Sequence, residues 1–269
     1  MRKQRHAQSA GSAGGATHRR CPIRLKLLCC EIFCREVCQL VAESPNTIDV
    51  EFLPKGLHDL GSERMVARLQ ERIDAVPAGV HEAVLLGYAL CNNGIVGLRA
   101  RAARLVIPRG HDCIAVFLGD RRKYLDYFNA HPGTYYRTTG WCEREDASTV
   151  GEATVQQKLG LNFRYQELVE KFGEDNANYI MATMGDFTAN YNRVAYISMG
   201  LACEEPFRRR AVKEAEDKGW TYDEIEGSME LLRKLIDGTW DEDFLLVEPG
   251  HTVAASHDEG VIRAAAVLD

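Results

Sequence analysis

The spacing of apolar side chains changes between two periods along the first half of the chain. Apolar residues crowd positions 23–30, as in a buried strand, and over 31–43 they recur at the spacing of an amphipathic helix. The same succession follows with an alternating strand at 48–53 and a helix from Ser62 to about residue 76, for which Ser62 is the expected N-cap. Strands that alternate with helices predict parallel βαβ units.

The pattern continues through the rest of the chain, with one less regular stretch at 134–160. We expect further strands at 83–87, 105–107, 135–138, 194–197, 221–225 and 244–247, and helices at 114–130, 163–172, 175–190, 204–218 and 228–237. The predicted fold class is α/β, with a mostly parallel sheet flanked by helices. The shared rhythm of the two halves also allows two Rossmann-like lobes, which we place at 23–140 and 141–269.

The first residues differ from the rest in charge and composition. Positions 1–20 hold five basic side chains, no acid, and a small polar stretch that cannot bury enough surface to fold. We therefore predict a disordered tail at 1–22. The remainder carries 39 acidic against 28 basic residues, a net charge of −11, and such an acidic surface argues against a nucleic-acid partner.

The compartment is indicated by cysteine usage and by the absence of targeting patterns. The basic start has no apolar core of a secretory signal, and no stretch approaches the ~20 apolar residues that span a bilayer. Nine cysteines, an odd number, in a long chain without an export signal are typical of reduced thiols. We expect a cytoplasmic protein with no membrane partner.

Side chains able to bind metal or to react follow each of the four predicted strands of the first half. They are Cys30 and Glu31; His58 and Asp59; Cys91, Asn92 and Asn93; and His111, Asp112 and Cys113. In open parallel sheets, ligands bind outside the carboxyl ends of the strands, at the point where the strand order reverses. We therefore expect these side chains, distant in sequence, to converge on one edge of the sheet.

Three of these cysteines and one histidine form a set suited to a soft metal. Thiolate and imidazole are ligands of zinc, and cysteines also hold iron–sulfur clusters. We therefore expect a zinc site, with an iron–sulfur cluster as the alternative, on Cys30, Cys91, His111 and Cys113. No CxxC or HExxH spacing supports the assignment, and each cysteine alone can equally be a small buried hydrophobic residue.

The acidic and basic groups at these strand ends are the expected catalytic candidates. His111 can act as a base if it is not a ligand, and Glu31 and Asp112 are the neighbouring carboxylates. The alternative for Asp112 is to cap the helix that follows it. His251, in the second half, can close the site from the other lobe; otherwise it is an exposed loop residue.

A glycine-punctuated loop, 87–97, leaves the third predicted strand. Its backbone amides, together with Asn92, Asn93 and Gly94, form an expected site for an anionic cofactor or ligand. It lacks both the GxGxxG pattern and the lysine of a phosphate-binding loop. The alternative is a tight turn in which Gly94 adopts the left-handed conformation.

Two further cysteines, Cys34 and Cys38, continue from Cys30 at the i+4 and i+8 positions of the predicted helix. This spacing puts them on one helix face, and it differs from the CxxxCxxC motif of radical enzymes. We expect both to be packing residues, because free cysteines are among the most buried residue types.

Six segments of the chain together resemble one known family. They occur in order between about residues 24 and 258 and are CCEIFCREVC, EFLPKGLHDLGSERM, LLGYALCNNGIVGL, IPRGHDCIAVFLG, PGTYYRTTGW and GWTYDEIEG. The family is domain of unknown function 1638, from bacteria and archaea. Its pattern falls on Cys30, Glu31, Arg35, His58, Cys91, Asn92, Asn93, His111, Asp112 and Cys113.

The resemblance implies a setting rather than an activity. Members occur in anaerobes, often encoded beside corrinoid-dependent methyl-transfer systems, and a zinc-bound thiolate is a common methyl acceptor. We therefore expect a zinc-binding α/β enzyme or accessory of methyl-group metabolism that acts on a small molecule, with a corrinoid or methyltransferase protein as partner. The alternatives are an iron–sulfur protein, a non-catalytic metal carrier, and a metal-free protein that binds a small anion.

Overall fold

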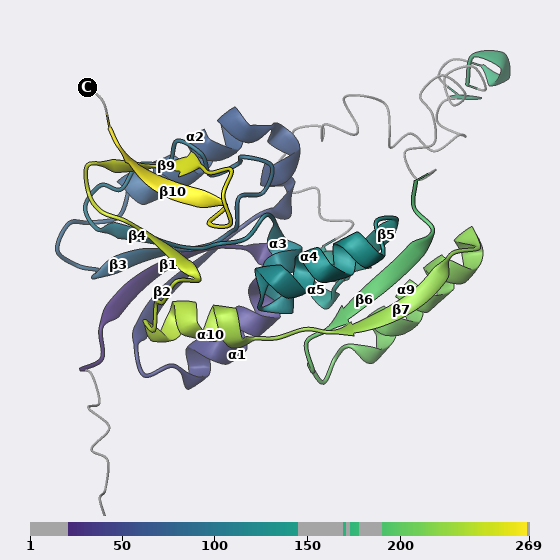
Figure 1. Cartoon of the computed structure of the whole chain (residues 1–269), viewed down its shortest axis with the longest axis horizontal. Coiled ribbons are helices and arrows are strands. Elements are labelled where there is room, and N and C mark those ends of the chain that lie inside the picture. The colour runs from purple at the N-terminus through teal and green to yellow at the C-terminus, as the bar shows by residue number, and fades with distance from the viewer. Residues whose placement is uncertain (1–20, 145–168, 171–172, 178–189, 268–269) are drawn as a thin grey trace, which may run out of the picture.

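The structure is a computed structural model that describes residues 21–144, 169–170, 173–177 and 190–267. Most of the expected tail at 1–22 and of the expected helices at 163–172 and 175–190 lies outside these residues. The described chain contains two larger sheets and a C-terminal hairpin (Figure 1). The predicted α/β class, with a mostly parallel sheet flanked by helices, is confirmed.

The larger sheet has five strands, assembled from the βαβ units of the first half. From one edge to the other they are β2 (Thr47–Leu53), β1 (Arg24–Cys30), β3 (Ala83–Gly87), β4 (Arg104–Pro108) and β8 (Phe244–Val247). The first four are parallel, and β8 pairs with β4 in the antiparallel direction. Every residue of β3 is buried, as expected for a strand covered on both faces.

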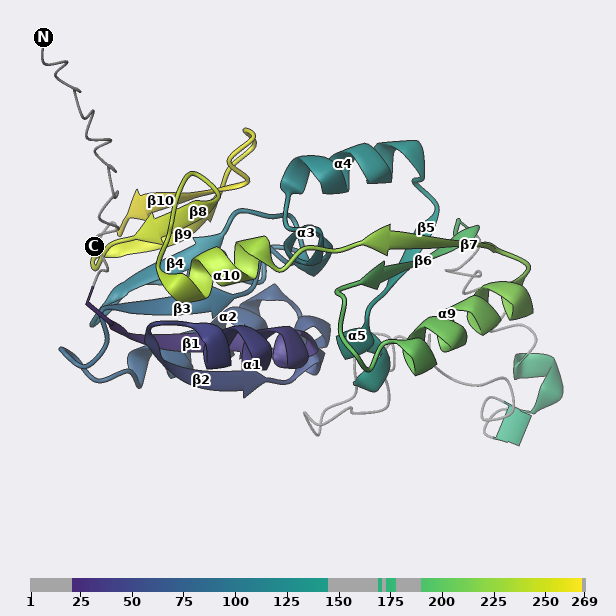
Figure 2. The ribbon, with the colours of Figure 1, turned by 90° about the horizontal axis from the view of Figure 1, so that it is seen from below.

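Helices cover both faces of this sheet. They are η1 (Glu31–Phe33), α1 (Cys34–Glu43), η2 (Lys55–Leu60), α2 (Ser62–Asp74), α3 (Cys113–Leu118) and α10 (Glu230–Asp237). Helix α4 (Arg121–Ala130) follows α3 and packs instead against the smaller sheet, described below. Helices α1 and α10 lie side by side on one face, and α2 lies on the other (Figure 2). Met65, Leu69 and Ile73 of α2 are buried together, as their i, i+4 and i+8 spacing predicts.

The smaller sheet has three parallel strands from the middle of the chain. Its strands are β5 (Thr134–Arg137), β6 (Arg193–Ser198) and β7 (Thr221–Glu226), and α5 (Thr139–Glu143) and α9 (Glu205–Lys218) lie beside them. Figure 2 shows the arrowheads of β6 and β7 directed toward the five-stranded sheet. The carboxyl ends of these strands therefore face the region between the two sheets.

Strand pairing crosses the lobe boundary that the sequence suggests at residue 140. β5 pairs in the smaller sheet, and β8, from the second half, pairs in the larger one. The division of the chain into two lobes at residue 140 is therefore still a prediction, and each of the two sheets contains strands from both sides of this position. The chain ends in a hairpin of β9 (His251–Ala255) and β10 (Ile262–Ala266), which the sequence analysis does not anticipate. None of the described helices is long and apolar enough to cross a membrane.

Two helix boundaries differ from the prediction for a local reason. The single helix expected at 114–130 is two helices, because Gly119 takes a left-handed φ of 71° that ends α3. Asp120 then caps α4, because its side chain accepts a hydrogen bond from the backbone N–H of Arg122. Ser62 is the first residue of α2 rather than its cap, and Gly61 occupies the cap position without a side-chain bond. Both boundaries are set by the backbone conformation of a glycine, which the spacing of apolar residues cannot predict.

Close packing at one glycine joins the two sheets. Helix α5 lies against η1, and a Cβ atom at Gly140 would stand 2.6 Å from the carbonyl carbon of Ile32. Real Cβ atoms essentially never come within 3.0 Å of a neighbour, so glycine alone permits this approach. The contact brings the start of α5, including Trp141, to the carboxyl end of β1.

Candidate functional site

The strand order sets the position of the site. β2 lies on one side of β1, whereas β3 lies on the other side and is followed by β4. The order therefore reverses between β1 and β3, and ligands of open α/β sheets bind at such a point, outside the carboxyl ends of the strands. Cys30 is the last residue of β1, and Tyr88 directly follows β3.

Three thiols share one neighbourhood at this edge. Cys30 and Cys91 are buried, and Cys113 opens α3 half-buried. Burial raises the pKa of the Cys30 thiol to about 12, and the Cys113 thiol raises it further. Burial also raises the pKa of Cys91 to about 12, with Cys30 adding to the effect. The pKa of Cys113 is raised well above its usual value by burial and then by Cys91. The three thiols therefore lie near enough to raise one another's pKa, and each is protonated.

The loop after β3 holds Cys91 in an uncommon backbone conformation. Cys91, Asn92 and Asn93 have successive φ values of 47°, 55° and 63°, a left-handed run that costs of order 1 kcal/mol per residue, somewhat less for asparagine. The Cys91 N–H donates to the carbonyl of His111 at 2.9 Å, which ties this loop to the one after β4. Strain of this kind persists only where the surrounding structure imposes it, and it clusters at functional sites.

Gly94 does not play the part expected of it. The left-handed residues of this loop precede it, and Gly94 itself is not among the residues with positive φ. A Cβ atom there would collide with Met65 and stand 3.0 Å from the Cys91 carbonyl oxygen, so close packing is what requires glycine. Its N–H donates to that same carbonyl and is not available to an anion, while Asn92 and Asn93 are exposed.

A half-buried histidine and a buried tyrosine have buried polar atoms without a hydrogen-bond partner among the described residues. The Nε2 of His58, in η2, and the hydroxyl of Tyr88 have no hydrogen-bond partner among the described residues. Their rings lie 6.0 Å apart between centroids. Burial lowers the pKa of His58 to about 4, which leaves its imidazole neutral. The pKa of Tyr88 is raised by burial and then by Cys30. An unsatisfied buried polar atom costs ~1–3 kcal/mol, so these two atoms are natural contacts for a ligand.

The pair His111 and Asp112 lies at the same edge but is engaged differently. His111 has an exposed side chain, and only its backbone carbonyl serves the site. Asp112 Oδ1 accepts from the N–H groups of Ile114 and Ala115 at 2.9 and 3.3 Å, which confirms the capping alternative. Its second oxygen accepts from the hydroxyl of Tyr124 at 3.0 Å. In this conformation Asp112 organises the start of α3.

Two other predicted residues take structural positions. The Glu31 carboxylate accepts from the Lys55 N–H at 3.0 Å and from the Arg144 guanidinium at 3.2 Å, so it links η1 to η2 and to the end of α5. His251 begins β9, and its carbonyl accepts from the Ala100 N–H. Ala100 precedes β4, which places His251 away from the carboxyl edge of the sheet.

Trp141 is a site residue that the sequence analysis does not single out. It comes from α5, beside the smaller sheet, and its side chain is hydrogen-bonded to Cys113, which lowers the pKa of that thiol against the effect of burial. The Lys55 ammonium lies 5.1 Å from the centre of its ring. The available signal is the segment PGTYYRTTGW, whose tryptophan follows the glycine that packs on η1.

The arrangement of the thiols differs from that of a preformed ion site. Among the described residues, no group of three or more histidine, cysteine, aspartate and glutamate side chains is positioned to hold a metal ion. The donor types are nonetheless suited to a soft metal, because thiolate sulfur and neutral imidazole nitrogen are both ligands of zinc. Holding a single ion would require the sulfur atoms to move closer together.

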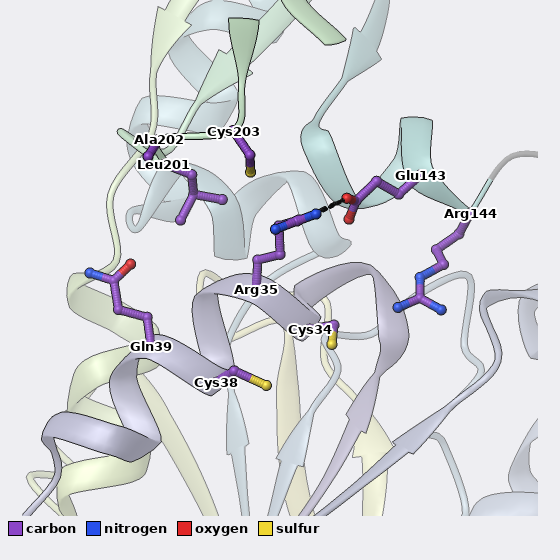
Figure 3. Close-up of a pocket in the computed structure, with 9 residues that line it drawn as sticks. All are labelled: Cys34, Arg35, Cys38, Gln39, Glu143, Arg144, Leu201, Ala202 and Cys203. Carbon is purple, nitrogen blue, oxygen red and sulfur yellow. Dashed lines mark hydrogen bonds and ion pairs between the residues drawn. The ribbon is translucent and has the colours of Figure 1, made fainter. Parts of the chain in front are cut away.

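An open pocket lies between α1, the end of α5 and the segment that follows β6. Its volume is about 730 Å³, and it is lined by Cys34, Arg35, Cys38, Gln39, Glu143, Arg144, Leu201, Ala202 and Cys203 (Figure 3). The Arg35 Nε donates to Glu143 at 2.8 Å across the pocket wall. Cys38 is exposed and Cys34 half-buried, so the expectation that both are packing residues is wrong. Helical periodicity predicts that the two cysteines share one face of the helix, but it does not predict whether another element covers that face.

Comparison with known proteins gives one match. No curated protein and no solved structure matches the chain. The family described as "Protein of unknown function (DUF1638)" matches residues 52–236, which include the strand ends at Cys91 and Cys113 and leave out the first at Cys30. This match covers more than half of the 269 residues. The chain therefore belongs to the DUF1638 family.

Proposed function

We propose that the chain is a metal-binding α/β protein whose metal is held by the thiolates of Cys30, Cys91 and Cys113. The observation that supports the proposal is that three thiols, from the ends of three neighbouring strands beside the point where the strand order reverses, are near enough to raise one another's pKa. Zinc is the first candidate, because thiolate and imidazole are its common ligands. Thiols with raised pKa values must lose their protons on binding, so uptake should release protons.

His58 is the better-supported fourth donor. Its imidazole is neutral, and its Nε2 is buried and has no hydrogen-bond partner among the described residues; neutral imidazole is the form that binds metals. His111, the histidine expected from the sequence, is exposed. The Tyr88 hydroxyl, also unpartnered, is placed to hydrogen-bond a small molecule at the same site.

An iron–sulfur cluster is the second candidate, and the spacing of the donors favours it. Zinc–sulfur bonds of ~2.3 Å require the sulfur atoms of one tetrahedral site to lie within roughly 4 Å of each other. No such ion-sized group occurs among the described residues. A cluster binds each thiolate through a different iron atom, and therefore suits thiols that are further apart.

Methyl-group chemistry is the activity we propose for such a centre. A metal-bound thiolate is a nucleophile at neutral pH, and the methyl donor we propose for it is a small molecule or a corrinoid protein. A carrier that holds the metal and turns nothing over would have the same ligands. Methyl transfer from a methyl-corrinoid donor, assayed with the metal-loaded chain, separates the enzyme from the carrier.

Metal analysis of anaerobically purified protein tests the proposal. We expect stoichiometric zinc, or iron with a visible absorption band, and loss of most of it in each of Cys30→Ser, Cys91→Ser and Cys113→Ser. Cys29→Ser is the matched control, because Cys29 is an equally buried thiol of the same strand and should lose stability but keep metal. His58→Gln should lower the metal content more than His111→Gln. A wild type that holds no metal and cannot be loaded with zinc or iron would contradict the proposal.

A further inference from the structure

The pocket beside α1 carries a second set of thiols, separate from the sheet edge. Cys34 and Cys38 lie one helical turn apart and both line the pocket. Figure 3 shows their sulfur atoms on the same side of the helix. The two side chains are hydrogen-bonded to each other, and the pKa of Cys38 is raised by burial and then by Cys34. Two thiols in contact on an open wall form a bidentate donor.

A disulfide is not what this geometry favours. Cβ atoms one turn apart on a helix are about 5–6 Å from each other, whereas a disulfide needs about 3.5–4.5 Å. The helix would have to distort to close the bond. A cation placed between the sulfur atoms extends the bridge by two metal–sulfur bonds of ~2.3 Å each and fits the undistorted turn.

The charges around the pair suit a monovalent soft cation. The pKa of Arg35 is raised chiefly by its hydrogen bond to Glu143, and to a smaller extent by the nearby thiols of Cys203 and Cys34. A nearby guanidinium stabilises the negative charge that two thiolates bring. Two thiolates and one monovalent cation together carry one negative charge, and the neighbouring Arg35 guanidinium would attract that charge.

We propose that Cys34 and Cys38 bind a soft d¹⁰ cation of the Cu(I) type, with two thiolates as ligands. Thiolates select Cu(I) over hard cations, which prefer oxygen. Binding is balanced by the loss of one proton from each thiol, so two protons leave as one cation enters, and no oxidant or reductant is required. Cys203, across the pocket from the pair (Figure 3), is a candidate for later transfer of the cation rather than a third ligand in this conformation.

Anaerobic titration of the full metal-free chain with Cu(I), against a chromophoric Cu(I) chelator, tests the proposal. Cys34→Ser, Cys38→Ser and the double variant should each lose the same one equivalent of retained Cu(I), because neither thiol alone holds the ion. Cys21→Ser, which removes an exposed thiol elsewhere, should lose none. Thermal unfolding of each variant checks that the fold is intact.

Protection from alkylation separates this pair from the sheet edge. Bound Cu(I) should slow the alkylation of Cys34 and Cys38, followed by peptide mass spectrometry, and should do so equally in a Cys30→Ser background. If Cu(I) leaves both alkylation rates unchanged in folded protein, the proposal is overturned. If Cu(I) is lost only in the Cys30, Cys91 and Cys113 variants and is retained in Cys34→Ser and Cys38→Ser, the cation belongs to the sheet edge and the proposal is likewise overturned.

Discussion

The substitution Gly140→Ala tests the contact that joins the two sheets. An added Cβ would stand 2.6 Å from the carbonyl carbon and 3.0 Å from the Cα of Ile32, against a normal separation of about 3.5–4.0 Å. The Ile32 carbonyl oxygen would be closer still, so helix α5 must retreat by more than about 1 Å to restore normal contact. Overpacking costs ~1–3 kcal/mol, and we expect the upper part of this range because both partners are backbone. Gly140 is absent from the positive-φ glycines, so alanine itself adds no backbone strain there.

Urea denaturation under reducing conditions measures the effect. Gly219→Ala is the matched control, because Gly219 is in the left-handed conformation, with a φ of 67° and a ψ of 27°, and has no atom within 4 Å of the added Cβ, so it should cost only ~1 kcal/mol of conformational strain. Gly140→Ala should also move Trp141 off Cys113 and speed the alkylation of that thiol. A Gly140→Ala variant with wild-type stability and unchanged Cys113 reactivity would refute the packing argument.

Three further substitutions test individual residues, each by urea denaturation. Glu36→Met should raise the free energy of unfolding by about 1–3 kcal/mol, because both carboxyl oxygens of Glu36 are buried without a partner among the described residues; a loss of stability would reveal a partner. Tyr88→Phe should raise it by ~1 kcal/mol in the ligand-free protein, since the deleted hydroxyl is unsatisfied, and an unchanged or lower value would count against a ligand contact. Asp112→Ala should cost ~0.5–2 kcal/mol as the cap of α3 is lost, whereas full stability with lost metal would make it a site residue instead.

Much of the fold could be predicted from apolar spacing because burial sets that spacing directly. The strand at 83–87 is found at those bounds, and the helix at 204–218 is found as α9. The hairpin of β9 and β10 escapes this reasoning, since one face is only partly buried and its alternation is weak. The exchange of β5 and β8 between sheets depends on pairing between distant strands, which local periodicity does not contain.

The candidate site could be predicted in position but not in composition. Placement at strand ends brought out Cys30, Cys91 and Cys113, because parallel strands share one carboxyl edge. The position of η2 relative to Tyr88 decides which histidine has an enclosed ring nitrogen. The sequence therefore pointed to His111, whereas the buried nitrogen without a partner among the described residues is Nε2 of His58. Trp141 comes from α5, beside the smaller sheet, and does not follow a strand of the larger sheet, so placement at strand ends could not predict it.

X-ray absorption at the metal edge of the anaerobically purified chain tests the central claim most directly, because it reads the atoms bound to the metal. The account predicts a first shell dominated by sulfur at about 2.3 Å, with sulfur lost from the shell in Cys113→Ser. For zinc, one nitrogen at about 2.0–2.1 Å should disappear in His58→Gln. A shell of oxygen and nitrogen without sulfur, or a sulfur shell that Cys113→Ser leaves unchanged, would contradict it.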